Sequence, residues 1–344
     1  MVTKPTNQEL LPLLPDRHPQ HDLFICDVAD AVLKDIMPQM EHPFYSLSKK
    51  PETNVRRYAH NGNWLEVTPS VKGLATIYDK DILIYCISQL MAKLKAGYEV
   101  SPRIRLNARE MLIFTNRGTS GRDYTALQES LERIRGTTIS TNIRAGDEEQ
   151  IDTFGLIESS SIRRKHGLDG RLLWVDVTLS DWVFNAIRAR EVLTLHRDYF
   201  RLRKPIERRV YEIARKHCGK QNEWRIGLSL LLKKTGSQSP LKRFRQMIRN
   251  LVKHDHLPDY SVTFCPAEDM VIFHNRGSLN PPDALVWNGF LDAEVYHDAR
   301  QLAPGWDVYE IEREWREWMT EEPTNPEKAF LGFVRKWAAR QGNR

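Results

Sequence analysis

The spacing of hydrophobic residues predicts a series of helices and strands that the chain runs through twice. In the first pass the pattern predicts a helix at 79–95, a short strand at 104–106 and a short helix at 108–114. A turn at 116–121, a longer helix at 122–135 and a β-hairpin at 154–179 follow. The same order is predicted a second time at residues 206–218, 223–226, 228–234, 235–239, 240–254 and 260–275. The two short helices begin at Ala108 and Leu228, about 120 residues apart.

Further elements flank the two repeats. Residues 1–22 hold four prolines and predict an extended arm, and short strands are predicted at 44–47, 56–60, 64–67 and 137–143. Asn61-Gly62 predicts a tight hairpin turn between two of these strands. After the linker Pro281-Pro282, an amphipathic helix is predicted at 306–319 and another from Ala329. We expect this helical pair to pack on the second repeat rather than to dock a host protein.

The repeated order is that of a winged helix, in which a helix-turn-helix is followed by a β-hairpin, the wing. The sequence therefore predicts an α+β fold with two winged-helix domains in tandem and a helical C-terminal tail. The predicted boundaries are an N-terminal arm and leading helix at 1–39, a first winged domain at 40–195 that is a candidate for dimerisation, a second winged domain at 196–280 that is the main DNA reader, and the tail at 281–344.

Charge is distributed unevenly along the chain. The formal net charge is +6, from 51 Lys and Arg against 45 Asp and Glu. Residues 1–200 are balanced, whereas residues 201–280 carry 17 basic and 7 acidic residues, and residues 281–344 carry 8 basic and 12 acidic residues. A local basic excess of this size indicates a polyanion as partner. The acidic tail is not expected to bind DNA.

The predicted helix at 240–254 is the most informative stretch. Its hydrophobic residues cluster on one side, its basic and amide residues occupy the other, and it contains no acid. A solvated helix normally mixes Glu with Lys, because such pairs stabilise it, so an all-basic face favours an anionic ligand. Ser239 is a candidate N-cap, placed where a phosphate can approach the helix N-terminus.

The side chains of this helix suit the reading of DNA. Arg and Lys donate to guanine and Gln pairs with adenine, so Lys242, Arg243 and Gln246 are candidates for base contacts. Arg249 and Lys253 are candidates for phosphate contacts. The remaining DNA-binding candidates of the second repeat are Arg245, Asn250, Lys233, Lys234 and Arg276.

The first repeat carries a weaker signal. The polar side of its longer helix holds Arg122, Thr125 and Arg133, but Glu129 and Glu132 share that side and argue against tight insertion into a groove. A dimer interface or an auxiliary phosphate contact fits this helix equally well. The hairpin tip Arg163-Arg164-Lys165-His166 either contacts phosphate or is a solvated polar turn.

Composition and motifs exclude other classes. The chain has 344 residues, 41% of them hydrophobic, and its apolar runs are too short for a membrane helix. Its N-terminus lacks a signal-peptide pattern, and four scattered cysteines favour neither disulfides nor zinc sites, so a reducing cytosolic location is expected. A phosphate-binding glycine loop, a nicking-enzyme histidine pair and hydrolase or zinc-protease motifs are absent. We therefore expect no enzyme activity, no metal and no cofactor.

Several longer segments resemble the plasmid replication initiator proteins of the RepA type. These are MEHPFYSLSKK at 40–50, VTPSVKGLATIYDKDILIYCISQL at 67–90, ERRVYEIARKHCG at 207–219 and SPLKRFRQMIRNLV at 239–252. The resemblance implies two winged-helix domains that bind repeated origin sequences, called iterons, on double-stranded DNA. It also implies opening of an AT-rich stretch, recruitment of the host initiator and replicative helicase, and a homodimer that represses its own promoter or takes part in copy control.

Two alternatives stand beside this reading. A transcriptional repressor with the same two domains would bind one palindromic operator as a dimer and gain nothing from tandem sites. A nickase or primase on a similar scaffold would leave a nicked or primed product. The charge pattern fits all three, because each binds DNA.

Overall fold

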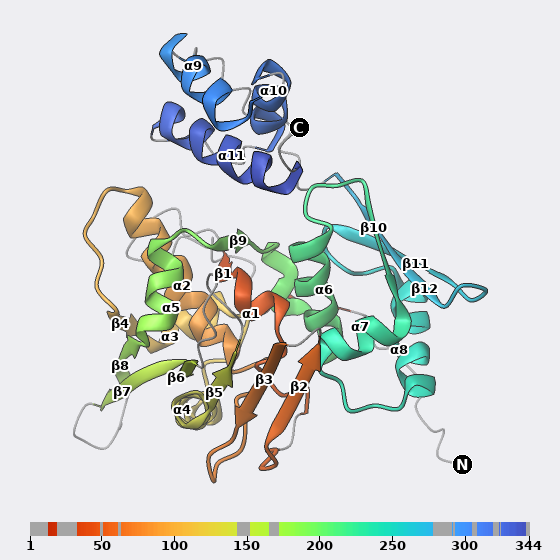
Figure 1. The fold of residues 1–344 in the computed structure, drawn as a ribbon. Coiled ribbons are helices and arrows are strands. Elements are labelled where there is room, and N and C mark those ends of the chain that lie inside the picture. The colour runs from red at the N-terminus through yellow and green to blue at the C-terminus, as the bar shows by residue number, and fades with distance from the viewer. Residues whose placement is uncertain are drawn as a thin grey trace. The chain divides into compact units, whose positions relative to one another are not determined.

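The computed structural model describes residues 13–18, 33–48, 51–60, 63–142, 152–164, 172–277, 291, 293–304, 308–318, 323 and 325–341. The chain divides into a larger unit, residues 1–276, and a smaller C-terminal unit, residues 277–344. The finer division of the larger unit at residue 195 stays a prediction. Figure 1 shows the elements in chain order.

The first repeat is built as the hydrophobic pattern predicts. It consists of α2 (Lys80–Lys95), β4 (Arg103–Asn107), α3 (Ala108–Phe114), α4 (Gly121–Gly136), β7 (Ile157–Arg164) and β8 (Leu172–Leu179). β8 pairs with both β4 and β7 in an antiparallel sheet of order β4-β8-β7. The helix α3 begins where expected because the Asn107 side chain accepts hydrogen bonds from the amides of Arg109 and Glu110, at 3.0 and 3.3 Å.

The second repeat has the same order of elements, and it forms a sheet of its own with the equivalent strand order. It consists of α6 (Pro205–His217), β10 (Glu223–Gly227), α7 (Leu228–Thr235), α8 (Leu241–His254), β11 (Tyr260–Cys265) and β12 (Met270–Asn275). The antiparallel sheet is ordered β10-β12-β11, so the first strand again pairs with the last. The equivalent short helices α3 and α7 begin at the two residues that the sequence predicts.

Other elements surround the first repeat. A second antiparallel sheet, of order β2-β3-β5-β6, is formed by β2 (Arg56–His60), β3 (Asn63–Thr68), β5 (Thr138–Thr141) and β6 (Asp152–Gly155). The short strands β1 (Lys34–Ile36) and β9 (Val192–Thr194) pair with each other. The remaining elements are α1 (Met37–Glu41), α5 (Asp181–Arg188) and the 3-10 helix η1 (Arg197–Arg201).

The predicted strand at 154–162 is wrong in one respect. The chain leaves the sheet of β5 and β6 at Gly155, buries Leu156, and enters the sheet of β7 and β8 at Ile157. Two strands in two sheets therefore replace one strand. The predicted strand at 44–47 contributes only a single bridge, between Ser46 and Thr76, and the Asn61-Gly62 turn lies outside the described residues.

Gly236 positions the turn between α7 and α8. It adopts a left-handed conformation (φ +70°), and a Cβ atom there would lie 2.5 Å from Cβ of Pro43. Its carbonyl oxygen accepts hydrogen bonds from Arg56 and from the Tyr58 hydroxyl, both at 3.4 Å. Glycine is needed at this position, because the turn lies directly against the chain that leads to β2.

The helix α6 joins the two repeats. Its apolar residues are buried, and so are Glu207, Arg208, Arg209, Glu212 and Arg215. Arg208 donates to Asp81 Oδ1 at the start of α2, at 2.7 Å, and to the carbonyls of Phe200 and Leu202. Arg209 donates to the carbonyl oxygens of α1, including Met40 at 2.8 Å. The buried charge of Arg208 is thus neutralised by a residue of the first repeat, whereas Glu207 pairs with Lys204 and His256 of the second half of the chain.

A buried ion cluster lies beside this helix. Lys80 Nζ is 2.6 Å from Asp35 Oδ2 and 2.9 Å from Glu212 Oε1, and all three side chains are 0% exposed. The Tyr199 hydroxyl donates to the same Glu212 oxygen at 2.6 Å. Burial raises the pKa of Asp35 to about 6, against the attraction of Lys80. One lysine therefore connects β1, α2 and α6.

The C-terminal unit contains α9 (Ala293–Leu302), α10 (Val308–Trp318) and α11 (Pro326–Gln341). Its core includes Ile311, Trp315, Phe330 and Val334, with the Trp315 and Phe330 ring centroids 5.2 Å apart. The sequence predicts the last two helices but not α9. Within the described residues, the predicted helical pair is therefore joined by a third helix, and the three share a core.

We predict that Lys80→Met lowers the free energy of unfolding by about 3–5 kcal/mol, because it leaves Asp35 buried without its cation. The control is Lys72→Met, since Lys72 and Glu132 form an exposed pair at 3.3 Å that is worth about 1 kcal/mol or less. Urea denaturation measures both. An equal midpoint for the two variants would show that the cluster does not hold the fold.

Candidate nucleic-acid interface

The helix α8 separates its apolar and basic residues completely. Phe244, Ile248 and Leu251 are buried against the rest of the second repeat. Lys242, Arg243, Gln246, Arg249 and Lys253 are exposed. The predicted amphipathic helix is therefore present at 241–254, and its basic face is turned to solvent.

Four of these exposed residues form a single stripe. Lys242, Gln246, Arg249 and Lys253 follow one another at intervals of three or four residues, so they lie along one line of the helix surface. At 1.5 Å per residue the stripe is roughly 16 Å long. The Arg249 guanidinium lies 5.8 Å from the ring centroid of Phe264 in β11, and Gln246 donates to Asn250 Oδ1 at 3.0 Å.

Three nearby acids are bound to other residues. Asp269, in the turn of the β11–β12 hairpin, takes two hydrogen bonds from Arg245, at 3.0 and 3.1 Å. Asp255 pairs with Arg276 at 2.6 Å, and Asp259 accepts from the Tyr211 hydroxyl at 2.7 Å. Among the residues that the structure describes, no carboxylate pairs with Lys242, Arg243, Arg249 or Lys253. The stripe is thus an uncompensated line of positive charge.

These ion pairs divide the predicted DNA-binding residues of the second repeat into paired and unpaired side chains. Arg245 ties α8 to the hairpin turn, and Arg276 ties the base of the hairpin to the end of α8, so neither presents a free guanidinium. The prediction that Ser239 caps the helix is wrong by one residue. The N-cap is Pro240, whose carbonyl accepts from the amides of Arg243 and Phe244, while Ser239 is half-buried in the preceding turn.

The two lysines of α7 differ from each other. Lys233 is exposed, whereas Lys234 is 24% exposed and lies 3.7 Å from Glu41. Lys234 Nζ also lies 3.3 Å from His217 Nε2, and the His217 ring stacks on Trp224 at 4.9 Å. Burial, together with the Lys234 charge, lowers the pKa of His217 to about 4. Neutral His217 therefore accepts a hydrogen bond from the Lys234 ammonium group at neutral pH.

We predict that this histidine makes the fold acid-sensitive. The unfolded chain takes up a proton near the ordinary histidine pKa of about 6.5, whereas the folded chain does so only near 4. Stability is therefore present above pH 6.5 and lost as the pH falls towards 4. Urea midpoints measured across this range should fall less for His217→Phe than for the wild type, because the variant keeps a ring on Trp224 but cannot take up a proton. The control is His254→Phe, which changes an exposed histidine and should fall by the wild-type amount.

The first repeat presents fewer free cations. Arg122 and Thr125 are exposed near the start of α4, but Arg133 donates twice to Asp79 at 2.8 Å. Arg163 in β7 is 58% exposed and lies 3.9 Å from Asp176. Arg164 ends β7, its side chain lies outside the described residues, and so does all of Lys165. The sequence prediction missed Arg103 and Arg105, which the alternation of basic and apolar residues in β4 would have found.

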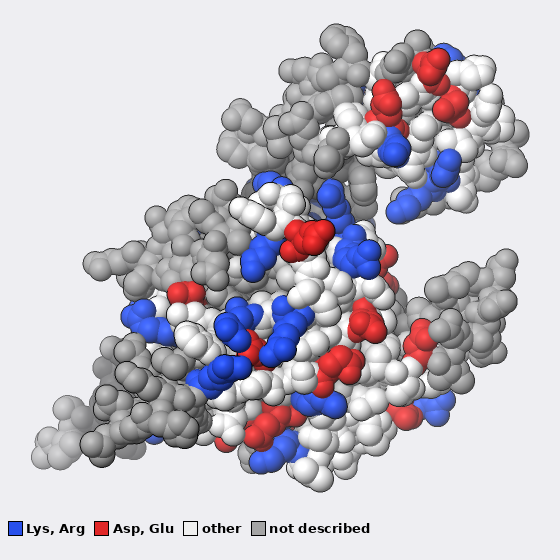
Figure 2. Space-filling view, turned by 90° about the vertical axis from the view of Figure 1, so that its left-hand side faces the viewer, with Lys and Arg blue, Asp and Glu red and all other residues white. Residues whose placement is uncertain are grey.

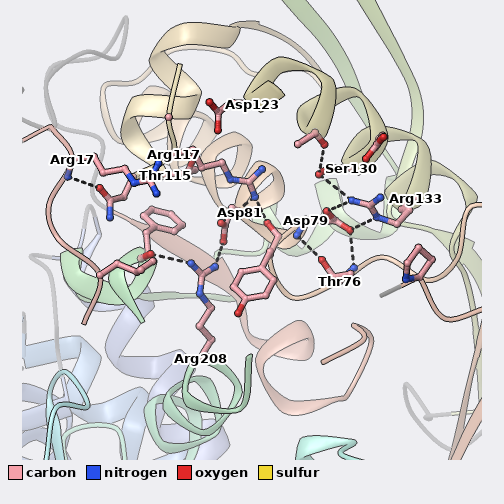
Figure 3. A pocket seen from close by; sticks show the side chains of 18 residues that line it. Arg17, Thr76, Asp79, Asp81, Thr115, Arg117, Asp123, Ser130, Arg133 and Arg208 are labelled. Atoms are coloured by element: carbon pink, nitrogen blue, oxygen red, sulfur yellow. Dashed lines mark hydrogen bonds and ion pairs between the residues drawn. The ribbon is translucent and has the colours of Figure 1, made fainter. Parts of the chain in front are cut away.

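A cavity of about 520 Å³ lies where the N-terminal arm, α2, α4 and α6 meet. Figure 3 shows Arg117 and Arg208 pointing at Asp81, and Arg133 pointing at Asp79. Asp81 accepts from Arg117 at 3.2 Å and from Arg208 at 2.7 Å, and the Arg17 amide donates to Asn116. A ligand would have to displace these bonds, so we assign the cavity to the junction between the repeats.

The described residues contain neither a metal-binding cluster nor a membrane-spanning helix. No cluster of three or more His, Cys, Asp or Glu side chains that could hold a metal ion is found there. No helix among those same residues is long and apolar enough to cross a membrane.

The comparison with known proteins identifies the family. The model of the replication initiator protein A family matches residues 34–262. The chain belongs to this family. It is also 36% identical over 258 residues to a putative replication protein of Wigglesworthia glossinidia brevipalpis, an alignment that covers 74% of this chain and 94% of that one. The resemblance seen in the sequence segments is therefore confirmed.

Two solved structures that the chain resembles are of domains 2 and 3 of RctB. One superposes with a TM-score of 0.53 at 13% identity and covers 69% of this chain and 97% of that one. A second has a TM-score of 0.47 at 15% identity. The first likeness concerns the fold alone and agrees with the predicted mixture of helices and sheets.

Proposed function

We propose that this replication initiator binds the repeated sequences of a plasmid origin, the iterons, through the exposed stripe of α8. The observation that carries the proposal is the absence, within the described residues, of any carboxylate paired with the three basic side chains of the stripe or with the neighbouring Arg243. An array of unpaired cations on one helix face repels itself and is stabilised by a polyanion. The family provides the context in which that polyanion is origin DNA.

The topology supports a winged-helix assignment for both repeats. In each, two helices joined by a turn precede a hairpin whose last strand pairs with the first strand of the repeat. In such a fold the second helix enters the major groove and the hairpin lies against the flanking backbone. We therefore assign α8 as the recognition helix and β11–β12 as its wing. Lys242, Arg243 and Gln246 lie in the half of α8 that reaches deepest.

The first repeat has the auxiliary role. Its recognition-type helix α4 carries exposed Glu129, and Arg133 is withdrawn into a pair with Asp79. We propose that it forms the homodimer contact or touches phosphate through Arg122. Recruitment of the host initiator and helicase, and a purely binding rather than catalytic action, are parts of the same proposal.

We predict that Arg249→Ala weakens binding to origin repeats and to scrambled DNA alike, because a phosphate contact carries no sequence information. The slope of log affinity against log salt should become shallower by about 1. Gel-shift titrations at several salt concentrations measure this. Arg225→Ala, an exposed arginine of β10 in the same repeat, is the matched control and should leave both quantities unchanged.

Gln246→Ala should instead relax the preference at one base position by about 1–3 kcal/mol while leaving the salt slope unchanged. If neither variant alters binding, α8 is not the DNA-reading helix. Footprinting on tandem repeats then separates the initiator from a repressor. Laddered occupancy of successive repeats fits an initiator, whereas protection of one palindrome only fits a repressor.

A further inference from the structure

The sheet of the first repeat has one buried face and one outer face on which arginine side chains are exposed. Its inner residues, such as Ile104, Leu106, Val175 and Val177, are buried. Because side chains alternate along a strand, the residues between them point outward. The outer face carries Arg103, Arg105, Ser161, Arg163, Trp174 and Asp176.

Three arginines on this face surround one carboxylate. Arg105 Nε lies 2.8 Å from Asp176 Oδ1, and the other two guanidinium groups, of Arg103 and Arg163, lie 3.6 and 3.9 Å from Oδ2. The arginine side chains are 55–64% exposed, whereas Asp176 is 5% exposed. Asp176 therefore gathers the arginines and leaves two positive charges uncompensated. Figure 2 looks onto this side of the molecule, where basic side chains gather.

An indole ring lies among these charges. Trp174 is 39% exposed, and the Arg105 guanidinium is 5.7 Å from its ring centroid. In the strand register Trp174 lies opposite Asn107 and next to Arg163. An aromatic ring left open to solvent on a flat, cationic sheet offers stacking and phosphate contacts together.

These features favour one class of ligand. Bases inside a duplex are already stacked on each other and cannot present a face to a side chain lying on a sheet, whereas unpaired bases stack readily on exposed aromatic rings. An acidic peptide would pair with the arginines, but it would not account for an indole ring exposed among them. We propose that this outer face binds single-stranded nucleic acid, with Trp174 stacking on a base and Arg103, Arg105 and Arg163 contacting phosphates.

This activity goes beyond the proposed reading of duplex repeats and uses a different surface. The stripe of α8 belongs to the second repeat, and the outer face belongs to the first. Variants of the two surfaces are therefore expected to separate the two activities.

The test is fluorescence anisotropy of the full chain with labelled oligothymidylate of about 12 nucleotides, and with oligouridylate of the same length to distinguish DNA from RNA. We expect Trp174→Ala to weaken binding about tenfold or more, and Trp174→Phe, which keeps an aromatic ring, to restore much of it. Arg105→Ala should make the salt dependence shallower by about 0.7, the value for one phosphate of a single strand. The matched controls are Tyr98→Ala and Arg188→Ala, which change exposed residues outside the outer face.

The same variants are titrated with duplex origin repeats. The proposal holds if Trp174→Ala loses single-strand binding and keeps duplex binding, while Arg249→Ala does the reverse. It is overturned if the wild-type chain does not bind the single strands, if Trp174→Ala and Trp174→Phe bind them as well as the wild type, or if Trp174→Ala loses duplex binding equally. Failure of duplex reading by wild type would affect only the proposed function.

Discussion

The need to neutralise charges buried on α6 determines how the two repeats are joined. Arg208 and Glu212 lie in the interior, where an unpaired charge costs several kcal/mol. Their partners, Asp81 and Lys80, are consecutive residues at the start of α2, in the other repeat. Separating the repeats would leave Arg208 without its carboxylate and would leave Glu212 with only Arg209 of the same helix as a cationic partner. The arrangement of the larger unit, and hence the direction in which α8 presents its stripe, depends on this pairing.

Much of the fold could be predicted because its signals are local. The period of hydrophobic residues and the cap at Asn107 placed α3 correctly, and alternation placed β11 and β12 at their observed bounds. The break between β6 and β7 could not be predicted, because it depends on tertiary pairing. β6 pairs with β5 in one sheet, and β7 pairs with β8 in another. The burial of Arg208 and Arg209 was also hidden, since a run of charged residues in a helix resembles a solvated face.

The candidate site was predictable to a similar extent. A helix without acids is visible in the letters, and the exposure of Arg249 and Lys253 agrees with that pattern. The withdrawal of Arg133, Arg245 and Arg276 into ion pairs could not be seen, because each acidic partner lies more than twenty residues away in the chain. The arginines around Asp176 come from β4 and β7, and Asp176 itself lies in β8, so only the fold brings these groups together.

The bond between Arg245 and Asp269 has a consequence for the thermodynamics of association. A hairpin that is free to swing would lose conformational entropy on meeting a ligand, and that loss would weaken the complex. Here the turn of the hairpin is already held against the helix by two hydrogen bonds before any ligand arrives. The helix and hairpin therefore approach a partner as one preformed surface, and the ordering has taken place during folding.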